Sequence, residues 1–336
     1  MKRMTAKKRL LVVFIAAVAV GATAALVFIF QFFGDAVRER SDLYISARTD
    51  YPGLLDSLRP RTDHHWAFDR YAGRLELERS FKPGHYVLEP GMNVVEIARM
   101  LKLGMQTPVR VTLNYARTRA FLASRLARQL DADSAELMRA LTDPQLAREV
   151  GTDSLQLFSL FIPNTYEFYW TVSPEDFVRR MRKEYDRFWT PERDAARRRS
   201  GLSRDEVLTL ASIVTEETNK ADEMPRVAGV YINRLRKGMP LQADPTVKYA
   251  LQDFSLRRIL HKHLRTPSPY NTYLNKGLPP SSIAATEGVL NFENHDYLFF
   301  CARPTFDGYH SFARTYGEHL ANARAYSAEL NRRNIK

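Results

Sequence analysis

A carboxylate near the end of an apolar helical segment is the first residue that could do chemistry. Val207, Leu210 and Val214 recur at three- and four-residue steps, which predicts a helix with one buried face. Glu217 continues this face, whereas Glu216 is turned about a quarter of the way round and should face solvent or a rim. Burial raises the pKa of a carboxyl group, as a general acid requires. From this helix alone a peripheral Glu217 at a frayed end is still favoured, because acids on buried faces are mostly paired or peripheral.

Other catalytic chemistries have weaker support. The pairs His64–His65 and His261–His263 lack the spacing of a metal site, so neither a metal nor a cofactor is expected. No Gly-x-Ser-x-Gly segment is present and Ser212 has no evident base, which argues against a serine hydrolase. The single cysteine, Cys301, has no partner for an intrachain disulfide and is expected to be a small buried apolar residue.

A glycosidase usually needs two acids that flank the scissile bond. Glu217 is the best buried candidate for one of them. Asp244 begins Asp-Pro-Thr246, a pattern that fits a helix N-cap followed by proline at the first helical position, so a structural role is expected for it. The residues alone therefore do not pair Asp244 with Glu217.

The elements that must position these residues follow from capping and periodicity. Ser203 followed by Glu206 forms a capping box that starts the Glu217 helix. Two later loops are rich in proline, small polar residues and tyrosine, a composition that is common around binding sites. After the Glu217 helix, the elements expected in chain order are a helix at Met224–Arg236 stopped by Gly238, the loops Ser268–Tyr273 and Gly277–Ile283, a buried strand at Tyr297–Ala302, a return strand at Gly308–Phe312 and a helix at Tyr316–Arg332. The return strand carries His310 outward or toward a cleft.

The preceding region alternates short strands and helices. Gly84–Leu113 predicts a strand–helix–strand unit, with its helix at Asn93–Leu103 capped by Gly104. This unit fits a carbohydrate-binding or docking module and fits a generic α/β subdomain equally well. The elements expected after it are helices at Arg117–Gln129 and at Ser134–Leu141 with Ser134 as N-cap, an aromatic turn and strand within Leu157–Trp170, and an amphipathic helix at Pro174–Arg199 with a break at Thr190–Pro191.

The N-terminal region predicts a membrane anchor. Leu10–Phe30 is almost entirely apolar, and about 20 such residues span a bilayer core. The aromatic segment Phe30–Phe33 suits the membrane interface, which extends the expected span to residues 10–33. Basic residues precede the span, so the positive-inside rule places the N-terminus in the cytoplasm and the body outside it, with the inner or plasma membrane as the location.

Composition and charge indicate which class of partner the chain could bind. The chain has 336 residues, of which 45% are hydrophobic, and a net charge of +12. Five of these charges come from the basic N-terminal cluster, and no nucleic-acid-binding motif is present. An anionic polymer or a membrane surface is therefore a better partner than nucleic acid. The cluster consists of Lys2, Arg3, Lys7, Lys8 and Arg9.

Six segments appear together in an order that resembles one known family. They are Leu210-Ala-Ser-Ile-Val-x-Glu-Glu-Thr218, Val230-x-Ile-Asn-Arg-Leu235, Leu241-Gln-x-Asp-Pro-Thr246, Ser268-Pro-Tyr-Asn-Thr-Tyr273, Gly277-Leu-Pro-Pro280 with Ile283-Ala284, and Gly308-x-His-x-Phe312. With these segments the chain resembles the YceG-like endolytic murein transglycosylases, the MltG family. The resemblance extends from about Ser80 to the C-terminus.

The resemblance implies a membrane-anchored enzyme that cleaves the MurNAc–GlcNAc β-1,4 bond of nascent, uncrosslinked peptidoglycan strands. The product would carry a 1,6-anhydroMurNAc end, and strand elongation would terminate. One acid suffices, because the C6 hydroxyl of the sugar is the nucleophile. Glu217 falls at the family's catalytic glutamate. A hydrolytic muramidase and a non-catalytic scaffold for peptidoglycan synthases are the alternatives. The residues that would bind substrate are Gln242, Asp244, Thr246, Tyr270, Asn271, Thr272 and His310.

The resemblance also implies an α+β fold with the catalytic acid on a helix. Peptidoglycan strands would be the substrate, with peptidoglycan synthases as further partners and neither nucleic acid nor a cofactor. The expected domains are a cytoplasmic tail (1–9), a transmembrane helix (10–33), a membrane-proximal segment (34–80), a LysM-like α/β subdomain (81–115), a helical connecting region (116–200) and a mixed α/β catalytic domain (201–336).

Overall fold

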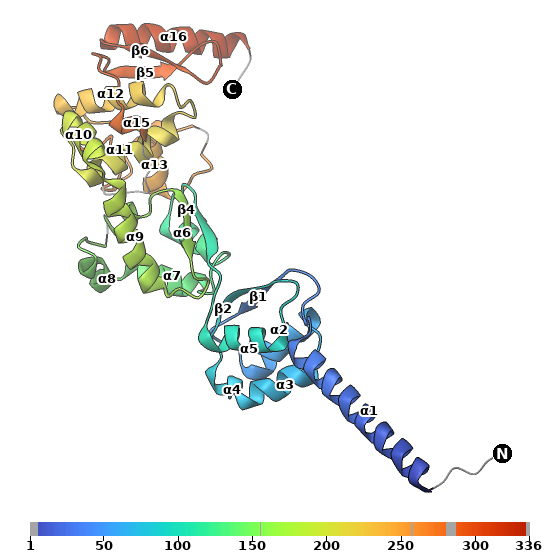
Figure 1. Cartoon of the computed structure of the whole chain (residues 1–336). Helices are drawn as coiled ribbons and strands as arrows, with labels where there is room; N and C mark the ends of the chain where they lie inside the picture. The colour runs from blue at the N-terminus through green and yellow to red at the C-terminus, as the bar shows by residue number, and fades with distance from the viewer. Residues whose placement is uncertain (1–5, 155, 257, 280–286, 334–336) are drawn as a thin grey trace. The chain divides into compact units, whose positions relative to one another are not determined.

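The computed structural model describes residues 6–154, 156–256, 258–279 and 287–333 of the chain (Figure 1). It combines helices with short strands, as an α+β chain was expected to do. Pro280 and the rest of the predicted loop up to Ala284 lie outside the described residues. The chain divides into two compact units: Met1–Arg110 with Gln129–Asp131 and Glu167–Val172, and Val111–Arg128 with Ala132–Tyr166 and Ser173–Lys336.

The first unit starts with the only helix in the described part of the chain that is long and apolar enough to cross a membrane, with a candidate span at Leu10–Phe33. This finding agrees with the predicted anchor. The helices and strands of the unit are α1 (Ala6–Phe33), β1 (Ser41–Ile45), α2 (Tyr51–Leu58), the 3-10 helix η1 (Arg59–Arg61), α3 (His65–Arg74), α4 (Leu77–Ser80), β2 (Gly84–Leu88) and α5 (Val94–Leu103).

The predicted strand–helix–strand unit exists, but its two strands lie in different sheets. Asn93 caps α5 in a capping box with Glu96, and Gly104 ends the helix with a φ of 68°. β2 pairs antiparallel with β1, and the next strand, β3 (Val109–Leu113), pairs with β4 (Asn164–Phe168). A single sheet over Gly84–Leu113 is therefore absent, and the LysM-like assignment and the domain boundaries stay predictions.

The second unit is mainly helical. Its elements after β3 are α6 (Arg119–Leu126), α7 (Ser134–Thr142), α8 (Pro144–Glu149), the 3-10 helix η2 (Gln156–Leu160), β4, α9 (Pro174–Phe188), α10 (Pro191–Ser200), α11 (Arg204–Glu217), α12 (Met224–Arg236), α13 (Asp244–Leu251), α14 (His261–Leu264), α15 (Glu287–Leu290), β5 (Phe299–Ala302), β6 (His310–Ala313) and α16 (Tyr316–Arg332).

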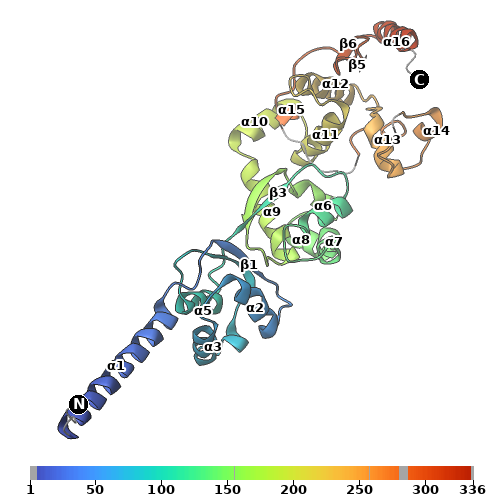
Figure 2. The ribbon, with the colours of Figure 1, turned by 90° about the vertical axis from the view of Figure 1, so that its right-hand side faces the viewer.

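α11 lies at the centre of the second unit, in contact with α12, α13 and α15 (Figures 1 and 2). Every residue from Val207 to Val214 is buried, so the helix is covered on all sides rather than along the single predicted face. The predicted break before Pro191 is confirmed, because α9 ends at Phe188 and α10 begins at Pro191. The final helix matches its predicted bounds, and no residue of it is fully buried.

Two local predictions were wrong. The N-cap of α7 is Asp133, which accepts hydrogen bonds from the backbone, and not Ser134. Both residues are common N-caps, and local sequence does not choose between neighbours. The strand predicted as buried, β5, is only half-buried, and Cys301 with it, because this strand belongs to a two-stranded sheet.

Candidate active site

The helix that carries Glu217 is anchored at its first turn. Ser203 accepts a hydrogen bond from the backbone of Glu206 at 3.2 Å, and the Glu206 carboxylate accepts one from the backbone of Ser203 at 2.7 Å. This is the capping box that the sequence predicts. Each side chain satisfies a backbone donor that would otherwise lack a partner, so the start of α11 is fixed.

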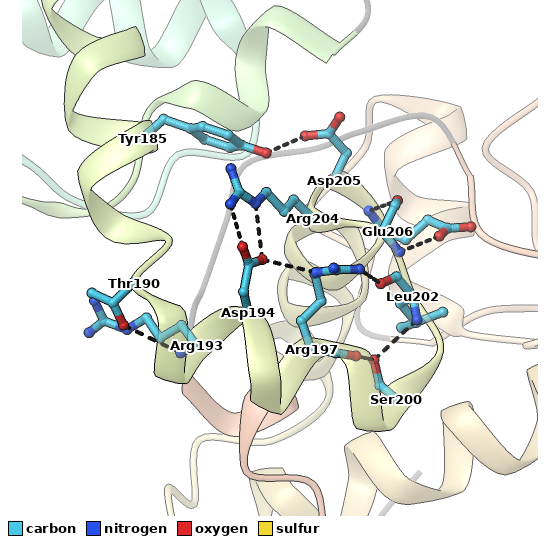
Figure 3. Close-up of polar contacts among 11 residues, drawn as sticks. Tyr185, Thr190, Arg193, Asp194, Arg197, Ser200, Leu202, Arg204, Asp205 and Glu206 are labelled. Carbon is cyan, nitrogen blue, oxygen red and sulfur yellow. Dashed lines mark hydrogen bonds and ion pairs between the residues drawn. The ribbon is translucent and has the colours of Figure 1, made fainter.

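Ion pairs tie the same end of α11 to the preceding helices (Figure 3). Asp194 on α10 binds Arg204 and also Arg197, whose guanidinium reaches the carbonyl of Leu202 at 2.7 Å. The Arg204 hydrogen bond lowers the pKa of Asp194 to about 2, so this carboxylate stays ionised. The Tyr185 hydroxyl on α9 donates to Asp205 at 2.9 Å.

Glu217 is the last residue of α11, and its carboxylate meets α12. The hydroxyl of Tyr231 donates to Oε1 of Glu217 at 2.8 Å, and Tyr231 is 1% exposed. Among the described residues, Tyr231 is the one hydrogen-bond partner of this carboxylate, which leaves Oε2 for another group. The peripheral, frayed position that the helix alone favours is therefore wrong.

Burial raises the pKa of Glu217 to about 7. The hydrogen bond from Tyr231 opposes this rise, as do the charges of Lys248 and Arg234, whereas the charge of Asp244 adds to it. The predicted direction of the shift is confirmed, and loss of hydration is its main cause. Near neutral pH both protonation states are populated, as a group that acts first as acid and then as base requires.

Glu216 is partly exposed and forms part of the wall of a neighbouring pocket. Arg117 binds it with two hydrogen bonds, from Nε at 2.7 Å and from Nη2 at 3.1 Å. Burial, followed by the charge of Glu216 and a hydrogen bond to it, raises the pKa of the Tyr115 hydroxyl. The two adjacent glutamates thus differ: Glu216 is paired with a cation, and Glu217 is desolvated.

The pocket beside Glu216 has an empty volume of about 430 Å³ and an aromatic wall. The ring centroids of Tyr249 and Tyr270 lie 4.6 Å apart, and the Arg117 guanidinium lies 5.4 Å from the centroid of Phe254. Glu217 is not among the described residues that line this pocket. The lining residues are Tyr115, Arg117, Ser212, Ile213, Glu216, Pro245, Thr246, Tyr249, Phe254, Tyr270 and Pro279.

Asp244 is not the N-cap that the sequence predicts. Ala243 takes this position without a capping side chain, and Asp244 lies in the first turn of α13. Its Oδ1 accepts a hydrogen bond from the Tyr273 hydroxyl at 2.6 Å. Asp244 is exposed, yet its charge acts on the pKa of Glu217, so the sequence-predicted acid does lie in the surroundings of the candidate catalytic group.

Three of the predicted substrate-binding residues hold the start of α13 in place. Gln242 has a left-handed backbone with a φ of 51°, and its N–H donates to the carbonyl of Thr272. The Thr272 hydroxyl oxygen accepts a hydrogen bond from the backbone of Ala243 at 3.0 Å and lies 2.8 Å from the Thr246 hydroxyl. Thr246 and Thr272 are buried, whereas the Gln242 side chain is exposed and available to a ligand.

Asn271 and Tyr270 have different positions although they are neighbours. The Asn271 amide donates to the carbonyls of Leu264 and Thr266, each at 2.9 Å, and its oxygen accepts from the backbone of Tyr273. Asn271 is 0% exposed, so it shapes the loop and does not present its amide to a sugar. Tyr270, by contrast, lines the pocket.

His310 is linked to Glu217 only through intermediate residues. Its Nδ1 donates to Oε2 of Glu223 at 2.7 Å, and its backbone N–H donates to Oε1 at 2.8 Å. The same buried carboxylate accepts a hydrogen bond from the Thr218 hydroxyl, directly after Glu217. His310 therefore anchors β6 to the end of α11 and does not line the pocket beside Glu216.

Sequence reasoning missed two residues of this region, Tyr231 and Arg117. The periodicity of Met224–Arg236 predicts that Tyr231 faces inward as a core residue, and the structure does bury it. Its hydrogen bond to Glu217 was not predicted. A buried tyrosine hydroxyl needs a hydrogen-bond partner, and this requirement was the available signal. Arg117 gave no such signal, because 99 residues separate it from Glu216.

Comparisons with known proteins show which family this chain resembles. Residues 44–325 match the model of the YceG-like family. The chain is 30% identical over 272 residues to a Bacillus subtilis protein named endolytic murein transglycosylase, which covers 75% of this chain and 74% of that protein. A Streptococcus pneumoniae protein of the same name is 27% identical over 306 residues, or 80% of this chain and 55% of that protein.

A solved structure has the same fold. The crystal structure of a YceG-like protein from Listeria monocytogenes superimposes with a TM-score of 0.56 at 27% identity, over 84% of this chain and 98% of that chain. The family match covers most of the sequence, including α11 to β6 and therefore Glu217 and its surroundings. This chain belongs to the YceG-like family.

Proposed function

We propose that this chain is an endolytic murein transglycosylase in which Glu217 is the catalytic acid and base. The observation that carries the proposal is the half-buried Glu217 carboxyl, with its pKa raised to about 7, in a chain similar to proteins of that name. The substrate is the MurNAc–GlcNAc β-1,4 bond inside uncrosslinked glycan strands.

In the first step, protonated Glu217 gives its proton to the glycosidic oxygen, and the bond between this oxygen and C1 of MurNAc breaks. In the second step, the Glu217 carboxylate takes the proton of the C6 hydroxyl as the C6 oxygen forms its bond to C1. The proton returns to Glu217 and no water is consumed. The substrate supplies its own nucleophile, so one carboxyl group suffices where a hydrolase uses two.

The surroundings of Glu217 fit these two steps. Tyr231 holds Oε1, so the carboxylate keeps one orientation and Oε2 can meet the glycosidic oxygen. Asp244 and its partner Tyr273 are polar groups suited to sugar hydroxyls, and Gln242 offers an exposed amide. Aromatic residues of the adjacent pocket, Tyr270 among them, can contact the apolar face of a sugar ring.

The test is digestion of uncrosslinked glycan strands by the detergent-solubilised full chain, with mass spectrometry of the new ends. A transglycosylase gives 1,6-anhydro ends, whereas a hydrolytic muramidase gives reducing ends that are heavier by one water. A scaffold gives neither. Reducing ends, or intact strands, would refute the proposed reaction.

We predict that Glu217→Gln lowers the cleavage rate by about 10²-fold or more, because an amide cannot donate and retake the proton. Glutamine keeps the size of the side chain and can still accept the Tyr231 hydrogen bond, so the fold should persist. The matched control is Glu175→Gln, the same change at an exposed position in the first turn of α9. Wild-type activity in Glu217→Gln would remove Glu217 from the mechanism.

We also propose that α1 spans the membrane, with the basic N-terminus in the cytoplasm and the chain after Phe33 on the extracytoplasmic side. Support comes from the apolar length of Leu10–Phe33 and from the five basic residues before it. This orientation places Glu217 on the side of the membrane where peptidoglycan is made.

A further inference from the structure

The chain leaves α1 without a flexible linker. Phe32 in the last turn of the helix is 8% exposed, and Ala36 and Val37 just after it are 1% exposed, all within the hydrophobic core of the first unit. The backbone of Ala36 donates to the carbonyl of Met92 at 2.8 Å. At Gly34 a Cβ atom would lie 2.5 Å from the carbonyl oxygen of Phe30, so only glycine fits this tight exit. The end of α1 is therefore packed into the hydrophobic core of the first unit.

The start of α3 lies directly against the last turns of α1. The ring centroid of Trp66 is 6.3 Å from Phe28 and 6.0 Å from Phe32, both in edge contacts. On the same stretch of α1, Phe30 meets the ring of His64 at 5.1 Å. Figures 1 and 2 both show α3 beside the end of α1. Two aromatic side chains at the start of α3, one of them on its N-cap residue, thus reach the final turns of the membrane-spanning segment.

Trp66 remains 58% exposed despite these contacts, and Phe30 remains 59% exposed. In water this would leave a large apolar patch uncovered. The candidate span of 24 residues is about 36 Å long at 1.5 Å per residue, slightly longer than a hydrocarbon core of about 30 Å. Its last turns therefore lie at the boundary between acyl chains and headgroups, the depth that tryptophan prefers.

Arginine side chains surround the exit of α1. A groove with an empty volume of about 770 Å³ is lined by Arg38, Arg40 and Arg61, together with Ala36, Glu39, Ser41, Pro60, Thr62 and Asp63. Arg38 pairs with Asp63 and Arg40 with Glu89, but the two guanidinium-bearing side chains are 82% and 67% exposed. Ion pairs this exposed are weak, so both arginines can bind a lipid phosphate instead.

We propose that Trp66 and these arginines form a second membrane contact beside α1. The indole of Trp66 enters the interfacial layer on the side where α1 emerges, and Arg38, Arg40 and Arg61 bind phospholipid phosphates above it. The contact fixes the tilt of the first unit against the membrane. It rests on the proposed membrane anchoring by α1 and is independent of the chemistry at Glu217.

The test uses the full chain in phosphatidylcholine–phosphatidylglycerol vesicles and lipids brominated near the carbonyl end of the acyl chain. These lipids should quench part of the tryptophan fluorescence, and Trp66→Phe should remove most of that quenching. Trp170→Phe is the same substitution outside the proposed contact and should leave the quenching unchanged. Quenching that persists in Trp66→Phe would overturn the contact.

Flotation and alkaline extraction of the same vesicles separate this proposal from the anchor itself. A chain that resists extraction but shows no Trp66-dependent quenching would refute the contact and leave the anchor intact. A chain released by alkali would refute both. The arginines have their own readout: quenching should be stronger in anionic than in pure phosphatidylcholine vesicles, and the triple variant Arg38→Gln, Arg40→Gln and Arg61→Gln should abolish that difference. A difference that survives would remove the arginines from the contact.

Discussion

At the scale of single residues, the protonation of Glu217 should set the pH dependence of catalysis. The first step needs the acid form, and its pKa is about 7, so kcat/KM should fall as the pH rises above about 7. The hydrogen bond from Tyr231 lowers this pKa. Tyr231→Phe should therefore move the alkaline limb of the profile to higher pH and also lower kcat, because Oε1 loses the group that orients it.

The measurement is the pH profile of strand cleavage for the wild type and Tyr231→Phe. A lower rate with an unmoved limb would mean that the Tyr231 hydroxyl orients Glu217 without lowering its pKa. Tyr309→Phe is the matched control, because this tyrosine bonds Asp222 at the surface and not Glu217. Its profile should follow that of the wild type.

The same carboxyl group should make stability depend on pH. The folded pKa of Glu217, about 7, lies above its ordinary value of 4.5, so the folded state holds the proton more tightly than the unfolded state. The cost of ionising the buried group is absent below about pH 4.5 and complete above about pH 7. Glu217→Gln removes this cost, so the variant should gain up to about 3 kcal/mol of unfolding free energy at pH 8 relative to pH 4.

Denaturant unfolding of the wild type and Glu217→Gln at both pH values tests this expectation. The quantity to compare is the difference in unfolding free energy between the wild type and Glu217→Gln, measured at pH 4 and again at pH 8. The other titratable groups contribute equally to both proteins, so a change in this difference comes from Glu217. An unchanged difference would show that Glu217 is hydrated in the folded state, and the raised pKa would then be wrong.

At the scale of elements, the first turn of α11 offers a prediction about stability without catalysis. Ser203→Ala removes the side chain that accepts from the Glu206 backbone and should cost about 1 kcal/mol of unfolding free energy. The pH profile of cleavage should stay unchanged, because Glu217 lies at the other end of the helix. Ser327→Ala, at an exposed position inside α16, should not destabilise the chain.

Elements were predictable from sequence where their signals are local. Capping boxes and periodicity define α5 and α11, and proline marks the break before α10. Strand pairing is not local: β3 pairs with β4, where the hydroxyls of Thr112 and Thr165 meet 53 residues apart, and no sequence pattern identified that partner. The candidate site was likewise predictable from sequence only where its signals are local. Helical phase pointed to Glu217, whereas its pairing with Tyr231 depends on how two helices pack.

The loop residues illustrate the limit of motif reasoning. A family motif marks Asn271 and Thr272 as important but does not say whether a side chain contacts the substrate or holds the backbone. The structure buries both and uses their polar groups on neighbouring loops. Burial depends on the complete packing of α13 against this loop, and composition does not encode it.

At the scale of the whole molecule, the charge around α1 should determine on which side of the membrane the site lies. Five basic residues precede the span, whereas the segment just after it mixes Asp35 and Glu39 with Arg38 and Arg40. Since the excess of positive charge lies before the span, alkaline phosphatase fused after Lys336 should be active and a cytoplasm-dependent fluorescent reporter inactive. Replacing the five basic residues by glutamine should weaken this preference. The reverse reporter pattern in the wild type would leave Glu217 on the side without peptidoglycan strands. That result would contradict the proposed orientation and also the proposed reaction in the cell.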